Sequence, residues 1–247
     1  MGSGDYYHLI RVNYCGGCHV MPTCSENKVV QKWAWSILSL VSLGLQVLSF
    51  CKLIPIGLTE VFGFITGAVC VLLVIQQNIW NFPIGIANNI FFIVLFLSSR
   101  LYGDMALQGV YVALGVLGWW QWLHSGEHRT KLSISHASVR EIAIIVAVGL
   151  VATVGLTLYF QSISDSAPFL DALTTVLSLI AQYLLNCKRI ENWYVWITAD
   201  ILYVGLYVQK GLHLTAVLYA IFITMCIAGL RSWAKSLQQQ NGKSVIP

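Results

Sequence analysis

The chain has 247 residues, of which 57% are hydrophobic and only 10% are charged, and its formal net charge is +4. Soluble domains carry about 25% charged residues, so this composition argues against a soluble protein. The basic residues are scattered and form no single patch, so the net charge does not indicate nucleic-acid binding. The apolar residues come instead in blocks of roughly 20, the length that a helix needs to cross a bilayer.

Eight apolar blocks follow a polar N-terminal segment, and each predicts one transmembrane helix. In chain order they cover residues 33–50, 58–79, 82–99, 105–123, 141–160, 169–186, 193–209 and 214–233. The blocks lack the alternating polarity of barrel strands. The sequence therefore predicts an all-α integral membrane protein with about eight transmembrane helices.

The distribution of basic residues predicts the orientation of these helices. With eight spans and a cytoplasmic N-terminus, only Lys52, Arg100 and Lys210 of the 14 Lys and Arg residues fall outside, which leaves 11 inside. Cytoplasmic loops carry an excess of Lys and Arg. We therefore expect both termini to be cytoplasmic, in a multi-pass protein of the cell inner (plasma) membrane.

A shift of 111 residues aligns the second, third and fourth helices with the last three without a gap. The matched pairs are Glu60 and Asp171, Asn81 and Asn192, Asn89 and Asp200, Phe92 and Tyr203, Phe96 and Tyr207, Tyr111 and Phe222, Gly118 and Gly229, and Trp122 and Trp233. The copies start four helices apart, an even number of crossings, so they enter the membrane in the same direction. A substrate site is expected between parallel repeats of this kind.

This repeat predicts a 3+1+3 arrangement, two parallel three-helix bundles joined by a linker helix, with one extra helix before them. The expected segments are a polar tail (1–32), the extra transmembrane helix (33–52), the first repeat (55–124), a loop and linker helix (125–165), the second repeat (166–235) and a C-terminal tail (236–247).

Polar and aromatic residues recur at helical spacing along five of the predicted helices, so they share faces. The faces are Asn81, Gly85, Asn88, Phe92 and Phe96; Gln108, Tyr111, Gly115, Trp119 and Trp122; Asp171, Thr175, Ser178 and Gln182; Asn192, Trp196, Tyr203 and Tyr207, with Asp200 nearby; and Tyr219, Phe222, Cys226 and Gly229. Facing lipid would be costly, so they predict a pocket with aromatic walls and polar groups, suited to a nucleoside-like ligand. The alternatives are polar contacts between helices and interfacial aromatic belts.

The run Trp80-Asn81-Phe82-Pro83-Ile84-Gly85-Ile86-Ala87-Asn88 resembles the W-N-x-P-x-G-x-x-N signature of the PnuC vitamin transporters. Leu101-Tyr102-Gly103-Asp104, Gln108, Tyr111 and Gly118-Trp119-Trp120-Gln121-Trp122 continue the resemblance, as do Lys188-Arg189-Ile190-Glu191-Asn192-Trp193, Trp196, Asp200 and Thr215-Ala216-Val217-Leu218-Tyr219. The likeness covers about residues 55–235.

The resemblance implies a SWEET-like fold and nicotinamide riboside as substrate. It implies facilitated diffusion, with trapping of the substrate by cytoplasmic phosphorylation, and leaves a thiamine or riboflavin transporter and a homo-oligomer open. The residues that it implies for binding are Trp80, Asn81, Asn88, Gln121, Asn192, Trp193 and Trp196. The polar faces add Gln182, Asp200 and Tyr203 as candidates.

Two other kinds of chemistry remain as alternatives. Cys15-Gly16-Gly17-Cys18-His19 matches the C-x-x-C-H pattern of haem attachment, and a zinc site there would also be conceivable. His124, His128 and His136 with Glu127 could belong to a membrane enzyme. The predicted topology places the first motif in the reducing cytoplasm, and the histidine spacing fits no known motif. Since no Walker or Ser/His/Asp pattern occurs, we expect no cofactor and no enzymatic activity.

Overall fold

The fold is taken from a computed structural model, which describes residues 58–98, 102–126, 131–164, 167–209, 211 and 213–243. The predicted extra helix at 33–50 and the C-x-x-C-H motif lie outside these residues. So do Glu127 and His128 of the histidine cluster.

Within the described residues the chain forms helices and no strand, which confirms the all-helical prediction. The helices are α2 (Leu58–Ile75), α3 (Asn81–Ser98), α4 (Tyr102–His124), α5 (Val139–Ser162), α6 (Pro168–Asn186), α7 (Asn192–Gln209) and α8 (His213–Lys243). Four helical segments are long and apolar enough to cross a membrane, namely α3, α5, α6 and residues Thr215–Gln240 of α8.

Two helix ends differ from the sequence prediction by four residues or more. Helix α2 ends at Ile75 rather than at residue 79, because the chain turns at Gln77, whose φ is 54°. Helix α8 continues to Lys243, well beyond residue 233. The added residues include Lys235 and three glutamines, which are good helix formers in water and need no membrane to stay helical.

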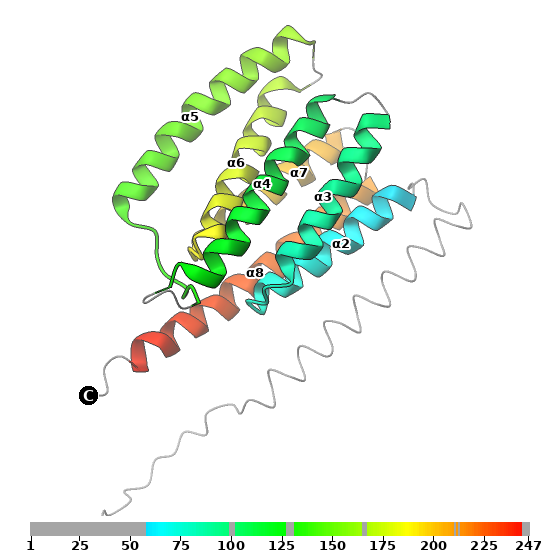
Figure 1. Cartoon of the computed structure of the whole chain (residues 1–247). Coiled ribbons are helices and arrows are strands. Elements are labelled where there is room, and N and C mark those ends of the chain that lie inside the picture. Colours follow the sequence, from blue (N-terminus) through cyan, green and yellow to red (C-terminus); the bar gives the residue numbers. More distant parts are fainter. Residues whose placement is uncertain are drawn as a thin grey trace, which may run out of the picture. The chain divides into compact units, whose positions relative to one another are not determined.

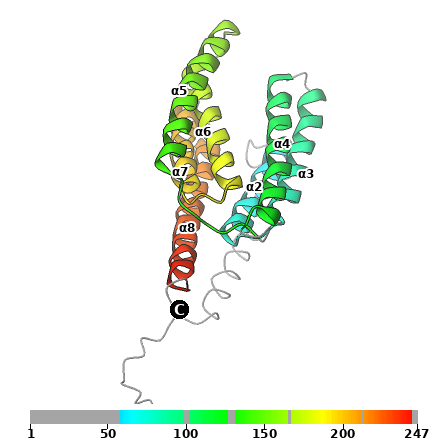
Figure 2. The same ribbon diagram turned by 60° about the vertical axis from the view of Figure 1, so that its left-hand side comes forward.

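The helices other than α5 contact one another around a closed ring. The neighbouring pairs are α2 and α3, α3 and α4, α4 and α6, α6 and α7, α7 and α8, and α8 and α2. Helix α5 packs against α6 (Figure 1). Figure 2 shows α2, α3 and α4 grouped on one side and α5 to α8 on the other.

The turn from α2 to α3 and the turn from α6 to α7 have the same conformation. Gln77 and Lys188, 111 positions apart, both have positive φ, 54° and 50°. The amide of each donates to the carbonyl three residues earlier, Val74 or Leu185, at 2.9 Å. Asn81 and Asn192 then each donate from Nδ2 to the carbonyl three residues before them, at 2.8 and 2.6 Å. The two turns, which are 111 residues apart like the repeats in the sequence, therefore share one backbone conformation.

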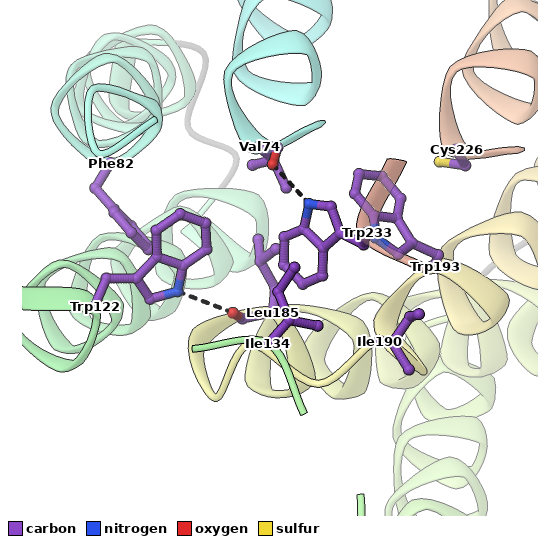
Figure 3. Close-up of a cluster of buried hydrophobic side chains, with 9 residues drawn as sticks. All are labelled: Val74, Phe82, Trp122, Ile134, Leu185, Ile190, Trp193, Cys226 and Trp233. Atoms are coloured by element: carbon purple, nitrogen blue, oxygen red, sulfur yellow. Dashed lines mark hydrogen bonds between the residues drawn. The ribbon is translucent and has the colours of Figure 1, made fainter. Parts of the chain in front are cut away.

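A cluster of buried aromatic and aliphatic side chains joins these turns to the ends of α4 and α8 (Figure 3). The indole Nε1 of Trp122 donates to the carbonyl of Leu185 at 3.1 Å, and that of Trp233 donates to the carbonyl of Val74 at 3.0 Å. Donors and acceptors are both 111 positions apart. Each half of the chain therefore holds the other through the same contact, as in a self-complementary twofold interface.

Residues 131–138, between α4 and α5, are bound to the turn between α6 and α7. The amide of Ser135 donates to the carbonyl of Lys188 at 3.1 Å, and the amide of Ile190 donates back to Ser135 at 3.0 Å. Arg189 forms an ion pair with Glu141 at 3.0 Å. Ile134, 2% exposed, belongs to the aromatic cluster. This segment therefore covers the cluster at the end of the bundle.

Candidate binding pocket

A cavity of about 330 Å³ lies among the six helices of the ring. Its polar and aromatic lining consists of Asn81, Phe82, Asn89, Tyr111, Ser178, Gln182, Asn192, Trp193, Trp196, Asp200, Tyr203, Tyr219 and Phe222. Gly67, Gly85, Gly115, Cys70, Cys226 and several aliphatic side chains complete it. The volume is in the usual range of small-molecule sites.

One wall of the cavity is aromatic. The rings of Tyr203 and Tyr219 lie 4.8 Å apart at an interplanar angle of 33°, and Phe222 packs edge-on to Tyr219 at 5.9 Å. Trp196, on α7, is also part of the lining. Aromatic faces attract cations and stack on flat rings, so this wall suits a planar ligand that carries positive charge.

Two buried polar atoms of the lining residues have no hydrogen-bond partner among the described residues. They are Oδ1 of Asn192, which is fully buried, and Nε1 of Trp193, which is 1% exposed. The amide nitrogen of Asn192 is occupied, since it donates to the carbonyl of Arg189 at 2.6 Å. Leaving such a group unpaired costs about 1–3 kcal/mol. Both atoms are inaccessible to a water molecule in this conformation, so a ligand in the cavity would reach them only after a side-chain shift.

Asp200 places a carboxylate in the cavity. It is 5% exposed and accepts a weak hydrogen bond from the thiol of Cys226 at 3.7 Å. Among the described residues, the ion pairs are His136 with Glu191 and Arg189 with Glu141, both away from the cavity lining. A carboxylate without a basic partner is costly in a membrane helix and indicates function. A cationic ligand would supply the missing partner.

The two halves of the chain contribute equivalent positions to the cavity but different side chains. Asn81 corresponds to Asn192 and Asn89 to Asp200. Other lining pairs at the same offset are Gly67 and Ser178, Val71 and Gln182, Val74 and Leu185, Phe82 and Trp193, Gly85 and Trp196, Tyr111 and Phe222, and Gly115 and Cys226. The second half therefore brings most of the polar and aromatic groups, and the first half contributes Asn81, Phe82, Asn89 and Tyr111.

Seven of the candidates predicted from the sequence line the cavity, namely Asn81, Gln182, Asn192, Trp193, Trp196, Asp200 and Tyr203. Three do not. Trp80 is 61% exposed, the Oδ1 of Asn88 accepts a hydrogen bond from Thr66 of α2 at 2.8 Å, and Gln121 is half-buried with its Oε1 unpaired.

Further lining residues were not among those candidates. They are Asn89, Tyr111, Ser178, Tyr219, Phe222 and Cys226. All except Asn89 lie on the polar and aromatic faces identified in the sequence. Asn89 could have been found through the repeat, because it aligns with Asp200.

Neither alternative chemistry gains support from the described residues. No group of three His, Cys, Asp or Glu side chains among them could hold a metal ion. His136 pairs with Glu191 at 2.9 Å, and His124 contacts the carbonyl of Trp120 at 3.0 Å, so both have local structural partners.

Comparison with known proteins identifies the family. The family model described as "Nicotinamide mononucleotide transporter" matches residues 57–235. The nicotinamide riboside transporter PnuC of Escherichia coli is 25% identical over 212 residues, which cover 75% of this chain and 89% of the relative. The riboflavin/roseoflavin transporter RibM of Streptomyces davaonensis is 25% identical over 71% of this chain and 84% of its own length. A crystal structure of the vitamin B3 transporter PnuC superposes with a TM-score of 0.62 at 25% identity, covering 84% of this chain and 92% of that one. The chain belongs to the nicotinamide mononucleotide transporter family.

Proposed function

We propose that this chain is a membrane transporter of nicotinamide riboside. The observation that carries the proposal is the cavity, which combines an aromatic wall, several lining amide and hydroxyl groups and the carboxylate of Asp200, which has no basic partner among the described residues. Several curated relatives, among them the Escherichia coli protein, are nicotinamide riboside transporters, which supports the same substrate.

The chemistry of nicotinamide riboside matches the cavity group by group. Its pyridinium ring carries a fixed positive charge, which Asp200 and the faces of Trp196 and Tyr203 would stabilise. Its carboxamide and ribose offer both donors and acceptors. The side-chain amides of Asn89 and Gln182 and the hydroxyl of Ser178, which line the cavity, offer partners of both kinds.

We assign the binding site to Asn81, Gln182, Asn192, Trp193, Trp196, Asp200 and Tyr203 and add Asn89, Ser178 and Tyr219, which share the lining. The contact of Asn88 with Thr66 supports a role in packing α3 on α2 instead. The exposure of Trp80 supports a position toward lipid or the interface.

The architecture proposed with this function is 3+1+3. Helices α2 to α4 and α6 to α8 form the two parallel repeats, α5 links them, and the segment 33–50 adds an eighth span. The reciprocal bonds of Trp122 and Trp233 support a twofold relation between the repeats. The distribution of Lys and Arg supports cytoplasmic termini.

The mechanism that follows is facilitated diffusion through alternating exposure of the cavity. Without a nucleotide-binding motif in the sequence, no ATP-driven step is assigned to this chain, and no chemical change of the substrate is expected. Net uptake would then depend on removal of the substrate inside the cell, and phosphorylation there would trap it.

The test measures binding and transport with the full-length purified protein. Calorimetry in detergent with nicotinamide riboside, thiamine and riboflavin gives the preferred ligand, and liposomes show whether that ligand equilibrates unchanged. Trp196→Ala should weaken binding by at least about tenfold, or about 1.4 kcal/mol. Tyr194→Ala is the matched control, because it truncates an aromatic residue of the same helix that is 58% exposed. Tighter binding of riboflavin, or accumulation of unmodified substrate against its gradient, would contradict the proposal.

A further inference from the structure

Three positions of the cavity are glycine in the first half of the chain and carry a side chain in the second. Gly67 corresponds to Ser178, Gly85 to Trp196 and Gly115 to Cys226, and all six residues line the cavity. The two halves of the chain thus contribute equivalent positions to the lining, but at these three positions the first half has no side chain. The reason for these glycines is not evident from the helices alone, since glycine costs about 0.5–1 kcal/mol relative to alanine inside a helix.

Packing does not require glycine at two of the three positions. A Cβ atom at Gly85 would come no closer than 3.7 Å to a neighbour, the Sγ of Cys70, and one at Gly67 no closer than 3.5 Å, to Phe222. Both are ordinary van der Waals distances. At Gly115 the same atom would meet Ile86 at 3.0 Å, which is tight. Gly67 and Gly85 therefore leave space that the protein itself does not fill.

Gly118 and Gly229 show the contrasting case. A Cβ at Gly229 would overlap the ring of Trp193, and one at Gly118 would overlap Asn186 and Phe82. These two glycines allow close packing of helices. The chain therefore uses glycine for two different purposes, and only Gly67 and Gly85 combine free space with a place in the cavity wall.

The twofold relation between the repeats places Gly85 across the cavity from Trp196. Gln77 and Lys188 occupy equivalent positions, yet they contact each other, with Nζ of Lys188 donating to Oε1 of Gln77 at 3.4 Å. Two equivalent residues can touch only close to the axis that relates them. Other equivalent pairs, such as Gly85 and Trp196, lie on opposite sides of that axis.

We propose that Gly67 and Gly85 determine where the ligand's ring binds, by leaving a slot opposite Trp196 into which a planar aromatic ring fits. The inference rests on the proposed function and adds to it a fixed orientation of the ligand. The ring lies between Trp196 and the glycine wall. The ribose points toward the remaining polar groups of the cavity, which include Asn81 and Gln182.

The orientation has a physical cause. Nicotinamide riboside has no twofold symmetry, so a perfectly symmetric cavity would accept it in two opposite orientations. Both repeats bring aromatic residues to the lining, but Gly85 stands where Trp196 stands in the other repeat, so a tryptophan opposite an unfilled glycine position occurs on one side of the axis alone. Asp200, which has no basic partner among the described residues, favours the cationic ring on the same side. The equivalent position in the first repeat is the neutral Asn89.

The test uses substitutions that fill the slot without disturbing the fold. Gly85→Ala and Gly67→Ala should weaken binding of nicotinamide riboside by at least about tenfold in calorimetry. Their melting temperatures should stay unchanged or rise, because alanine favours the helix and meets no close atom. Gly109→Ala and Gly155→Ala are matched controls, since their added Cβ atoms meet nothing within 4 Å and neither residue lines the cavity. Both controls should keep full affinity.

A double-mutant cycle separates the slot from a general effect on the cavity. If Gly85 acts by admitting the ring to Trp196, then Trp196→Ala should cost much less in the Gly85→Ala background than in the wild type. Fully additive losses would overturn the inference, and so would unchanged affinity or a lower melting temperature in Gly85→Ala. A wild-type protein that does not bind nicotinamide riboside would overturn the proposed function, and this inference with it. Binding by the wild type with unchanged Gly85→Ala would overturn this inference alone.

Discussion

Replacing Gly229 by alanine should destabilise the protein, although alanine is the better helix former. A Cβ at this position would overlap three atoms of the indole of Trp193. That indole cannot move aside easily, because Trp193 is 1% exposed and packs edge-on against Trp233 at 5.4 Å. Trp233 is itself fully buried and hydrogen-bonded to Val74.

The magnitude follows from two opposing terms. Overpacking in a filled core costs about 1–3 kcal/mol. The gain in helix propensity offsets about 0.5–1 kcal/mol of it. The net loss is therefore roughly 0–2.5 kcal/mol. A chain of this length shifts its melting temperature by about 2–4 °C for each kcal/mol.

Thermal unfolding of the purified protein in detergent would measure this loss. Gly155→Ala is the control, because it lies in α5 with nothing within 4 Å of an added Cβ, and it should raise the melting temperature slightly. The two substitutions are chemically identical and should act with opposite sign. If Gly229→Ala proved as stable as Gly155→Ala, the close packing of Trp193 against α8 would be refuted.

Three further predictions concern single side chains. Trp122→Phe should lower the free energy of unfolding by about 1 kcal/mol, because it loses the hydrogen bond to the Leu185 carbonyl. Thermal unfolding should show a similar loss for Trp233→Phe, and clearly unequal losses would contradict the reciprocal contact. Asp200→Asn should weaken calorimetric binding of the cationic nicotinamide riboside by about tenfold or more, and an equal weakening for an uncharged ligand would contradict a role in charge recognition. Burial, reinforced by Lys131, lowers the pKa of Lys188 to about 8. Between that value and the unfolded value of 10.5, the unfolded chain binds more protons than the folded protein. The free energy of unfolding of the wild type should therefore rise relative to that of Lys188→Met as pH rises from 7 to 10. A constant difference between the two proteins would refute the shift.

The sequence predicted the helices well because the signal for each is a long apolar block. The end of α2 was missed for a physical reason. The predicted block ran through the polar residues Gln76, Gln77 and Asn78 because Ile79 resumes the apolar pattern, although these three residues mark the turn. The contacts of residues 131–138 could not be predicted from the sequence either. Arg189 donates from Nη1 to the hydroxyl oxygen of Ser135 at 2.7 Å, a contact between residues far apart in the chain that no local sequence pattern indicates.

The cavity contains part of the predicted candidate set, and the difference at Asn88 comes from its position on helix α3. Asn88 and Asn89 are neighbours, so they point about 100° apart on α3. The motif and the spacing selected Asn88, whereas the cavity contains Asn89 and Asn88 faces Thr66. Periodicity identifies a face only to within about one residue. The alignment of Asn89 with Asp200 is a better predictor of the cavity lining than helical spacing, because equivalent positions of the two repeats face the same axis.

The reciprocal bonds of Trp122 and Trp233 have a consequence for cooperativity. In the proposed twofold arrangement, a rigid rotation of one repeat against the other lengthens both indole-to-carbonyl distances by the same amount. Neither bond can therefore break while the other persists, and this end of the bundle opens in an all-or-none manner. Each bond contributes about 0.5–1.5 kcal/mol, and separation of the buried cluster around the two indoles adds to the cost of opening, so the differential affinity of a bound ligand has to offset both terms.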